Sequence, residues 1–190
     1  MRGEICIMNK TLVLALLIGL VSCLSPDDMA VTSDPDAKAL DHLLMSALTN
    51  QSHVQLKKVV ELDSSIETSE IPFDTLIVKK DLKTLMEYSF ARLIRSANYN
   101  KTSQEAGILY ERKKKEKKGP VSIFINKNKN GVIHSMDVRF EEENYLYRSS
   151  QQIQLYFENN SLINYKIEGS RKLIGLDRSN YLIEVNIGNS

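Results

Sequence analysis

Residues 121–140 read VSIFINKNKNGVIHSMDVRF, two stretches in which apolar and polar side chains alternate. Alternation with a period of two separates the side chains onto the two faces of a β-strand. Asn130-Gly131, between the stretches, is typical of a turn that joins antiparallel strands. The stretch predicts a hairpin with one buried face, which carries Val132, His134, Met136, Val138 and Phe140. His134 is therefore predicted to be a core residue.

The same alternation returns three times toward the C-terminus. Its apolar sets are Ile153-Leu155-Phe157, Ile163-Tyr165-Ile167 and Tyr181-Ile183-Val185-Ile187, and residues 158–161 have the composition of a turn. Together these patterns predict an antiparallel meander of five strands. One face of such a sheet is apolar, and the other is free to meet water.

Helical patterns precede the meander. Apolar residues recur at helical spacing over 36–49, where Asp34 or Asp36 can act as N-cap, and again from Leu82 to Ala97. Segment 53–71 mixes two periods and is interpreted as part strand. The expected fold is α+β, with N-terminal helices packed on one face of a C-terminal antiparallel β-meander.

Composition excludes several classes of protein. The chain has 190 residues, of which 42% are hydrophobic and 26% charged, as in an ordinary globular domain. The formal net charge of +1 gives no overall field that would attract a polyanion. We therefore expect no nucleic-acid partner.

The N-terminus carries an export signal. Residues 11–22 are uncharged and follow Lys10, and this stretch is shorter than the roughly 20 residues of a transmembrane helix. Residues 1–22 are therefore predicted to be a signal peptide. Its end, Leu20-Val21-Ser22-Cys23, resembles the lipobox of bacterial lipoproteins. The alternative is an ordinary secretory signal that is cleaved near Cys23.

The resemblance to lipoproteins implies that Cys23 becomes the first mature residue and carries acyl chains that anchor it in the membrane. Leu24, in place of Asp, implies the outer membrane of the cell envelope. Cys6 lies in the removed segment, so the mature chain can form no internal disulfide. Residues 23–36 are predicted to be a flexible lipidated tether, and residues 37–190 a single α+β domain.

A second resemblance concerns the sheet. The segment from about 106 to 168, with its hairpin at Tyr156–Ile163, is similar to the sheet of small uncharacterised bacterial outer-membrane lipoproteins. This resemblance implies no activity.

No catalytic motif stands out. The three histidines have no metal-ligand spacing, and the chain lacks GxSxG and a glycine-rich phosphate loop. Glu141-Glu142-Glu143 is interpreted as a solvated charge run rather than a cation site. We expect no enzyme activity, no metal and no cofactor.

Candidate interaction residues fall into two groups. Partner contacts are expected from the outer sheet face and one loop, namely Phe124, Arg139, Tyr145, Tyr147, Tyr156 and Lys166. Anion contacts are expected from the run Lys113, Lys114, Lys115, Lys117 and Lys118. The alternative for this run is a solubilising loop that protects an edge strand.

These observations favour a membrane-anchored, non-catalytic binding module with a protein partner. The alternative function is a carrier of a lipid or another hydrophobic ligand in an apolar cavity under the sheet. A dry packed core favours the first function, and an open apolar cavity favours the second.

Overall fold

The computed structural model describes residues 34–48, 54–95, 98–116 and 118–188, which belong to one compact unit. The predicted signal peptide and Cys23 lie outside the described residues. The helices are α2 (Pro35–Ala47), α3 (Thr75–Asp81), α4 (Lys83–Met86) and α5 (Phe90–Arg95). The strands are β1 (Gln55–Leu62), β2 (Ser65–Pro72), β3 (Tyr99–Gln104), β4 (Gly107–Arg112), β5 (Ser122–Lys127), β6 (Ile133–Glu143), β7 (Tyr147–Glu158), β8 (Ser161–Leu173) and β9 (Ser179–Gly188).

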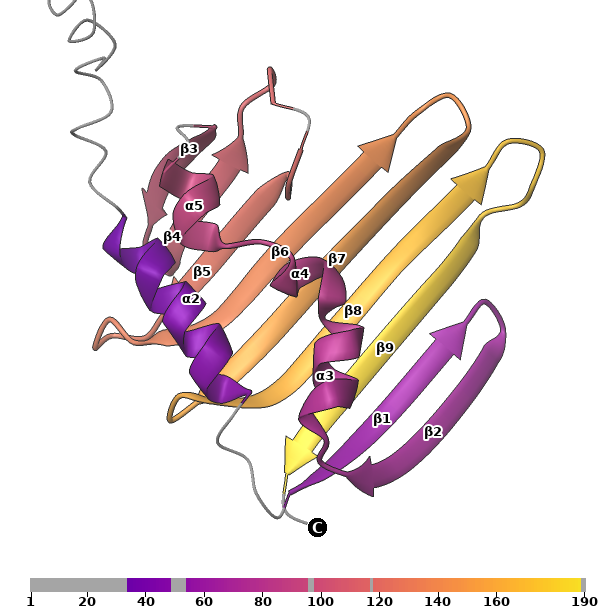
Figure 1. Cartoon of the computed structure of the whole chain (residues 1–190), viewed down its shortest axis with the longest axis horizontal. Helices are drawn as coiled ribbons and strands as arrows, with labels where there is room; N and C mark the ends of the chain where they lie inside the picture. Colours follow the sequence, from indigo (N-terminus) through magenta and orange to yellow (C-terminus); the bar gives the residue numbers. More distant parts are fainter. Residues whose placement is uncertain (1–33, 49–53, 96–97, 117, 189–190) are drawn as a thin grey trace, which may run out of the picture. The chain divides into compact units, whose positions relative to one another are not determined.

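The described chain is α+β and mostly antiparallel sheet. Its nine strands have the order β2-β1-β9-β8-β7-β6-β5-β4-β3 (Figure 1). Strands β5 to β9 are the five predicted strands, and they pair in sequence order as a meander. The β7–β8 turn also matches the prediction, because Asn159 and Asn160 both have the positive φ values that a two-residue hairpin turn requires.

The predicted order of helices first and sheet last is wrong. The β1–β2 hairpin lies between α2 and α3 in the chain, and β1 pairs with the C-terminal strand β9. Strands β3 and β4, which extend the other side of the sheet, had no predicted counterpart. Tyr99 and Tyr110 are the two side chains that these strands bury, which is too sparse an apolar pattern to predict strands.

One face of the sheet packs against the helices (Figure 1). Alternate strand residues such as Val138 and Leu155 are buried there, together with Leu40 of α2, Val78 of α3 and Phe90 of α5. This side is the covered face. The other side, which includes Asp137 and Gln154 at the intervening positions, is the uncovered face.

Two bulges correct the predicted set of buried residues. Between β5 and β6 the pairing shifts by one residue, so that Ile133 is buried while Val132 and His134 are exposed. The prediction of a core His134 is therefore wrong. A similar shift between β7 and β8 gives Leu162 the buried position that was predicted for Ile163.

Helix α2 begins before the predicted end of the tether. The carboxylate of Asp34 caps it by accepting the backbone N–H of Asp36 at 2.9 Å. Asp34 also forms an ion pair with Lys101 of β3 at 2.8 Å, and Asp36 forms one with Lys127 of β5. Residues 34–36, which were assigned to a flexible tether, are thus held against the sheet.

The helix predicted over 82–97 is divided among short helices. Asp41 of α2 explains the last division, because its carboxylate accepts the Ser89 hydroxyl at 2.9 Å and the backbone N–H groups of Phe90 and Ala91 at 2.8 and 3.1 Å. A side chain from α2 therefore caps α5. The apolar stripe persists despite the breaks, since Leu82 and Leu85 remain buried with Phe90.

Helix α3 is fixed to the sheet by a partly buried polar contact. Asp81 accepts hydrogen bonds from the Lys58 ammonium at 2.7 Å and the Tyr165 hydroxyl at 2.8 Å. Burial and the neighbouring Asp81 carboxylate raise the pKa of Tyr165. The hydroxyl therefore remains a neutral donor, and β1, β8 and α3 share one carboxylate.

Candidate functional site

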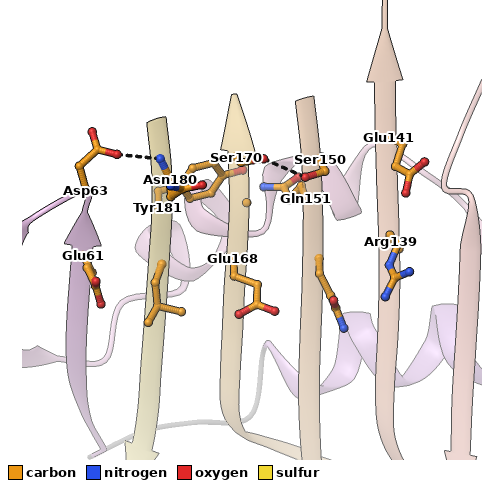
Figure 2. A pocket seen from close by; sticks show the side chains of 13 residues that line it. Glu61, Asp63, Arg139, Glu141, Ser150, Gln151, Glu168, Ser170, Asn180 and Tyr181 are labelled. Carbon is orange, nitrogen blue, oxygen red and sulfur yellow. Dashed lines mark hydrogen bonds between the residues drawn. The ribbon is translucent and has the colours of Figure 1, made fainter. Parts of the chain in front are cut away.

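The uncovered face carries an open basin of about 550 Å³ (Figure 2). Strand register positions its residues in two rows, each of which crosses from β6 toward β1. One row contains Arg139, Gln152, Glu168, Leu182 and Glu61. The second row contains Glu141, Ser150, Ser170 and Asn180, and Asp63 lies beside it in the β1–β2 turn. These residues define the uncovered basin.

The uncovered basin is predominantly acidic, because four carboxylates and one guanidinium line it. Asp63 is occupied within the protein, since it accepts the Asn180 backbone N–H at 2.8 Å. Glu168 contacts the Lys166 ammonium at 3.0 Å, which raises the pKa of Lys166. Glu61, Glu141 and Arg139 form no ion pair with any residue in the described part of the chain. These three charges are available to a partner.

Neighbouring polar side chains preorganise the basin. The hydroxyls of Ser150 and Ser170 lie 3.1 Å apart across β7 and β8. Beside the basin, Asp137 accepts amide hydrogen bonds from Gln152 at 2.5 Å and Gln154 at 2.9 Å. The arrangement offers carboxylates, hydroxyls and amides on a rigid sheet, which suits recognition of a polar, cationic surface.

A glycine allows Tyr181 to pack on the opposite side of this part of the sheet. A Cβ atom at Gly169 would lie 2.5 Å from the Tyr181 ring and 2.6 Å from the Ser150 carbonyl oxygen. Burial raises the pKa of Tyr181. Arg171 lies over the same ring at 5.9 Å.

Four of the predicted partner residues share the uncovered face. Arg139 lines the basin, whereas Phe124, Tyr156 and Lys166 lie outside its lining on β5, β7 and β8. Tyr156 is 36% exposed, and Phe124 is half-buried beside Leu109 of β4. The face therefore combines two aromatic side chains with the charged basin.

Tyr145 and Tyr147 lie elsewhere, in or beside the β6–β7 connection at one end of the sheet. Tyr145 is 81% exposed. The Tyr147 hydroxyl donates a hydrogen bond to Glu142 at 2.6 Å, and this contact raises the pKa of Tyr147. The predicted partner residues thus belong to two separate surfaces.

The predicted basic run lies in the β4–β5 connection at this same end. Lys113, Lys114, Lys115 and Lys118 are exposed and form no ion pair within the described residues, whereas Lys117 lies outside them. Arg112 closes the loop by donating a hydrogen bond to the Gly119 carbonyl at 2.5 Å.

Sequence reasoning missed most of the basin because its residues come from five strands. Glu61 and Glu168 occupy polar positions between apolar ones, so the alternation predicts that their side chains point away from the core. It does not predict which strands lie next to each other in the sheet. It also missed Leu173, Ile174 and Leu176, which lie in or beside the β8–β9 connection. Three large apolar residues around Gly175, next to Arg171 and Lys172, are the signal that could have identified them.

A smaller hollow of about 360 Å³ lies near β1 and β9, and most of its lining is apolar. Val60, Leu62, Tyr181 and Ile183 contribute at positions with the same alternation as the buried Leu56 and Val185. The hollow therefore belongs to the covered side of the sheet, beyond the continuous buried core.

Within the part of the chain that the structure describes, no three His, Cys, Asp or Glu side chains are grouped to hold a metal ion. Nor do the described residues include a helix of the length and apolar character that crossing a bilayer requires. Comparison with family models, curated proteins and solved structures gave no match to this chain.

Proposed function

We propose that this chain is an exported lipoprotein, anchored through Cys23, whose folded part is a non-catalytic module that binds a basic protein partner on the uncovered face. The uncovered basin is the observation that carries the proposal. It combines an excess of carboxylates with an uncovered, rigid sheet surface.

The anchor is supported by the signal segment and the sequence Leu20-Val21-Ser22-Cys23. Acylation at Cys23 would hold the protein at a membrane of the cell envelope, which we propose is the outer membrane. Mass spectrometry of the mature N-terminus tests this part, and we expect an acylated Cys23. An unmodified mature N-terminus would contradict the anchor and leave the binding face untouched.

Charge complementarity supports a basic partner. Glu61 and Glu141 lack ion-pair partners in the described residues. Arg139, two residues before Glu141 on β6, can donate hydrogen bonds to a carbonyl or carboxylate of the same partner. Complementary charges mainly increase the association rate and fix the orientation of a complex. On the same face, four residues from Gln152 along β7, the aromatic ring of Tyr156 adds the type of side chain that commonly dominates an interface.

A lysine-rich peptide serves as a probe of this chemistry. We expect the full-length chain to bind it, and the double variant Glu61→Gln/Glu141→Gln to bind about tenfold or more weakly, as loss of two complementary charges would produce. Glu105→Gln, an exposed carboxylate in the β3–β4 turn, is the matched control. Equal weakening by the control would indicate a nonspecific charge effect and contradict the proposed face.

Photo-crosslinking in the native membrane tests the protein partner directly. A photoreactive residue at Arg139 or Leu182 of the basin should form a discrete adduct, whereas one at Lys129 or Asn159, in turns at the opposite end of the sheet from the basin, should not. Adducts at the control positions only, or at none of the four, would contradict a partner on the uncovered face.

A second candidate function is carriage of a hydrophobic ligand. The apolar lining of the hollow near β1 and β9 favours it, and a volume of about 360 Å³ lies within the range of small-molecule sites. A fluorescent fatty acid should then bind, and Leu62→Arg, a change at a half-exposed position, should abolish that binding. Unaltered binding by Leu62→Arg would exclude this hollow as the site.

A further inference from the structure

Three of the four connections at one end of the sheet gather basic and apolar residues that are distant in sequence. Residues 112–116, 118, 142–148 and 171–178 lie in and beside the β4–β5, β6–β7 and β8–β9 turns, and we name these stretches the hairpin edge (Figure 1). Tyr147 pairs with Leu173, and the Ile174 backbone N–H donates to the Leu146 carbonyl at 3.0 Å. The second and third turns are therefore joined directly.

The basic loop adjoins those two turns. Arg112 and Glu116 line the same hollow as Arg148, Lys172 and Arg178. The β4–β5 connection therefore lies beside the two turns that carry the apolar tips, a proximity that the sequence alone does not reveal.

The tips of the hairpin edge expose large apolar side chains. Tyr145 is 81% and Ile174 72% exposed, and Leu146, Leu173 and Leu176 are each more than half exposed. Five such side chains within two adjoining turns form a patch, which is uncommon on a surface that meets only water. At the opposite end of the sheet, the connections expose one large apolar side chain, Val132, among the described residues.

Charge also distinguishes the three stretches of the hairpin edge from the connections at the opposite end. The described residues of the hairpin edge include nine basic and four acidic side chains, a net charge of +5. Among those acids, Glu143 pairs with Arg148, and Glu142 accepts the Tyr147 hydroxyl. The opposite connections, residues 105–106, 128–132 and 159–160, carry Glu105 and Lys129, whose charges cancel.

The backbone of the tips is suited to a medium with little water. The Asn144 side chain accepts the N–H groups of Leu146 and Tyr147 at 2.8 and 2.9 Å, and the Leu176 N–H donates to the Leu173 carbonyl at 3.2 Å. Polar backbone groups that are paired within the turn need no water when they enter an apolar phase.

We propose that the hairpin edge is a membrane-contacting surface that inserts its apolar tips into the interface of a bilayer containing anionic lipid. Tyrosine beside aliphatic residues suits the headgroup level of a bilayer, and the surrounding cations suit its negative surface. Lipid is favoured over a protein partner because the positive charge surrounds apolar tips that protrude at the turns of the sheet. The inference does not depend on what occupies the uncovered face.

A tryptophan reporter tests insertion directly, because the chain contains no tryptophan. In the full-length chain with Cys23→Ala, Tyr145→Trp should show emission shifted to shorter wavelength, and quenching by brominated lipid, when vesicles of phosphatidylcholine and phosphatidylglycerol are added. Leu76→Trp, an exposed position on α3, is the matched control and should show neither change.

Charge variants test the lipid class. Replacing Lys113, Lys114 and Lys115 with glutamine should weaken the vesicle-induced emission change of Tyr145→Trp about 100-fold in lipid concentration, since each lysine near an anionic surface contributes about fivefold. With the three lysines intact, vesicles of phosphatidylcholine alone should bind about as weakly as the anionic vesicles bind the glutamine variant. Added salt should weaken binding to the anionic vesicles. Vesicle binding without a change in Tyr145→Trp emission would overturn the proposal, as would no binding at all. A response independent of anionic lipid would also overturn it.

Discussion

The covered and uncovered faces of the sheet use alternate residues of the same strands for different purposes. On β6 and β7, Val138 and Leu155 are buried under the helices, while Asp137 and Gln154 between them carry polar groups on the other face. The apolar set specifies register and burial. The polar residues between them, on the uncovered face, contribute little to register or burial. They can therefore form a binding surface with little loss of stability.

The largest difference between the faces is expected at Leu155. Leu155→Ala should reduce the free energy of unfolding by about 2–4 kcal/mol, because it removes buried apolar surface and leaves a cavity. Denaturant unfolding measures the effect. Gln154→Ala, at the next position, should change stability by less than about 0.5 kcal/mol. Equal losses at both positions would mean that the two faces are wrongly assigned.

Polar contacts on the covered face should come next. Asp81→Ala should cost about 2 kcal/mol, because it leaves the Lys58 ammonium and the buried Tyr165 hydroxyl without their shared acceptor. Asp81→Asn keeps an acceptor for Tyr165 and should cost less. A stability of Asp81→Ala equal to that of the native chain would show that α3 is held by apolar packing alone.

A smaller effect is expected at the start of α2. Asp34→Ala should cost about 1 kcal/mol through loss of the helix cap. Burial raises the pKa of the Asp34 carboxyl, but hydrogen bonds from Lys101 and the Asp36 backbone outweigh it and leave the pKa below 3.8. Because the folded pKa is lower than the unfolded one, this carboxylate stabilises the fold above the unfolded pKa.

The stabilisation by Asp34 should disappear as the pH falls through its folded pKa. Asp34→Asn retains a capping side chain and loses the charge, so it isolates this dependence. In thermal unfolding, the stability difference between the native chain and Asp34→Asn should shrink toward zero as the pH falls below the usual range of a carboxyl pKa. A difference that grows in acid would contradict the assigned direction of the pKa.

The smallest stability effect is expected on the uncovered face. Arg139→Ala and Tyr156→Ala should each change the free energy of unfolding by less than about 0.5 kcal/mol, and both should weaken capture of the partner. Parallel unfolding and crosslinking measurements separate the two effects. A large loss of stability with unchanged binding would show that this face has a structural role instead.

Periodicity was sufficient to predict the central sheet but not its margins. Strands β5 to β9 follow from alternation, since residues such as Ile123, Leu155 and Val185 are buried. Strand β3 has one buried side chain, Tyr99, so no such pattern marks it. The error at His134 has a different cause, because the extra residue of a bulge reverses the alternation beyond it.

The candidate sites were predicted less completely than the fold. An outward direction for Arg139 and Tyr156 follows from alternation, but the basin also needs Glu61, which becomes a neighbour only through the pairing of β1 with β9. Similarly, the basic run signalled a charged loop, whereas its apolar neighbours Leu146 and Ile174 come from two other turns. Long-range pairing carries this information, and it cannot be read from local sequence.

The position of β9 between β1 and β8 has a consequence for folding kinetics. Asp63 and Asn180, which are joined by a hydrogen bond, lie 117 residues apart in the chain. If the β1–β2 hairpin forms early, the edge of β1 that faces away from β2 stays unpaired until β9 has formed. Closing so long a loop slows folding. During that interval the edge of β1 can pair with other chains, so the time needed to synthesise β9 sets the exposure to misassembly.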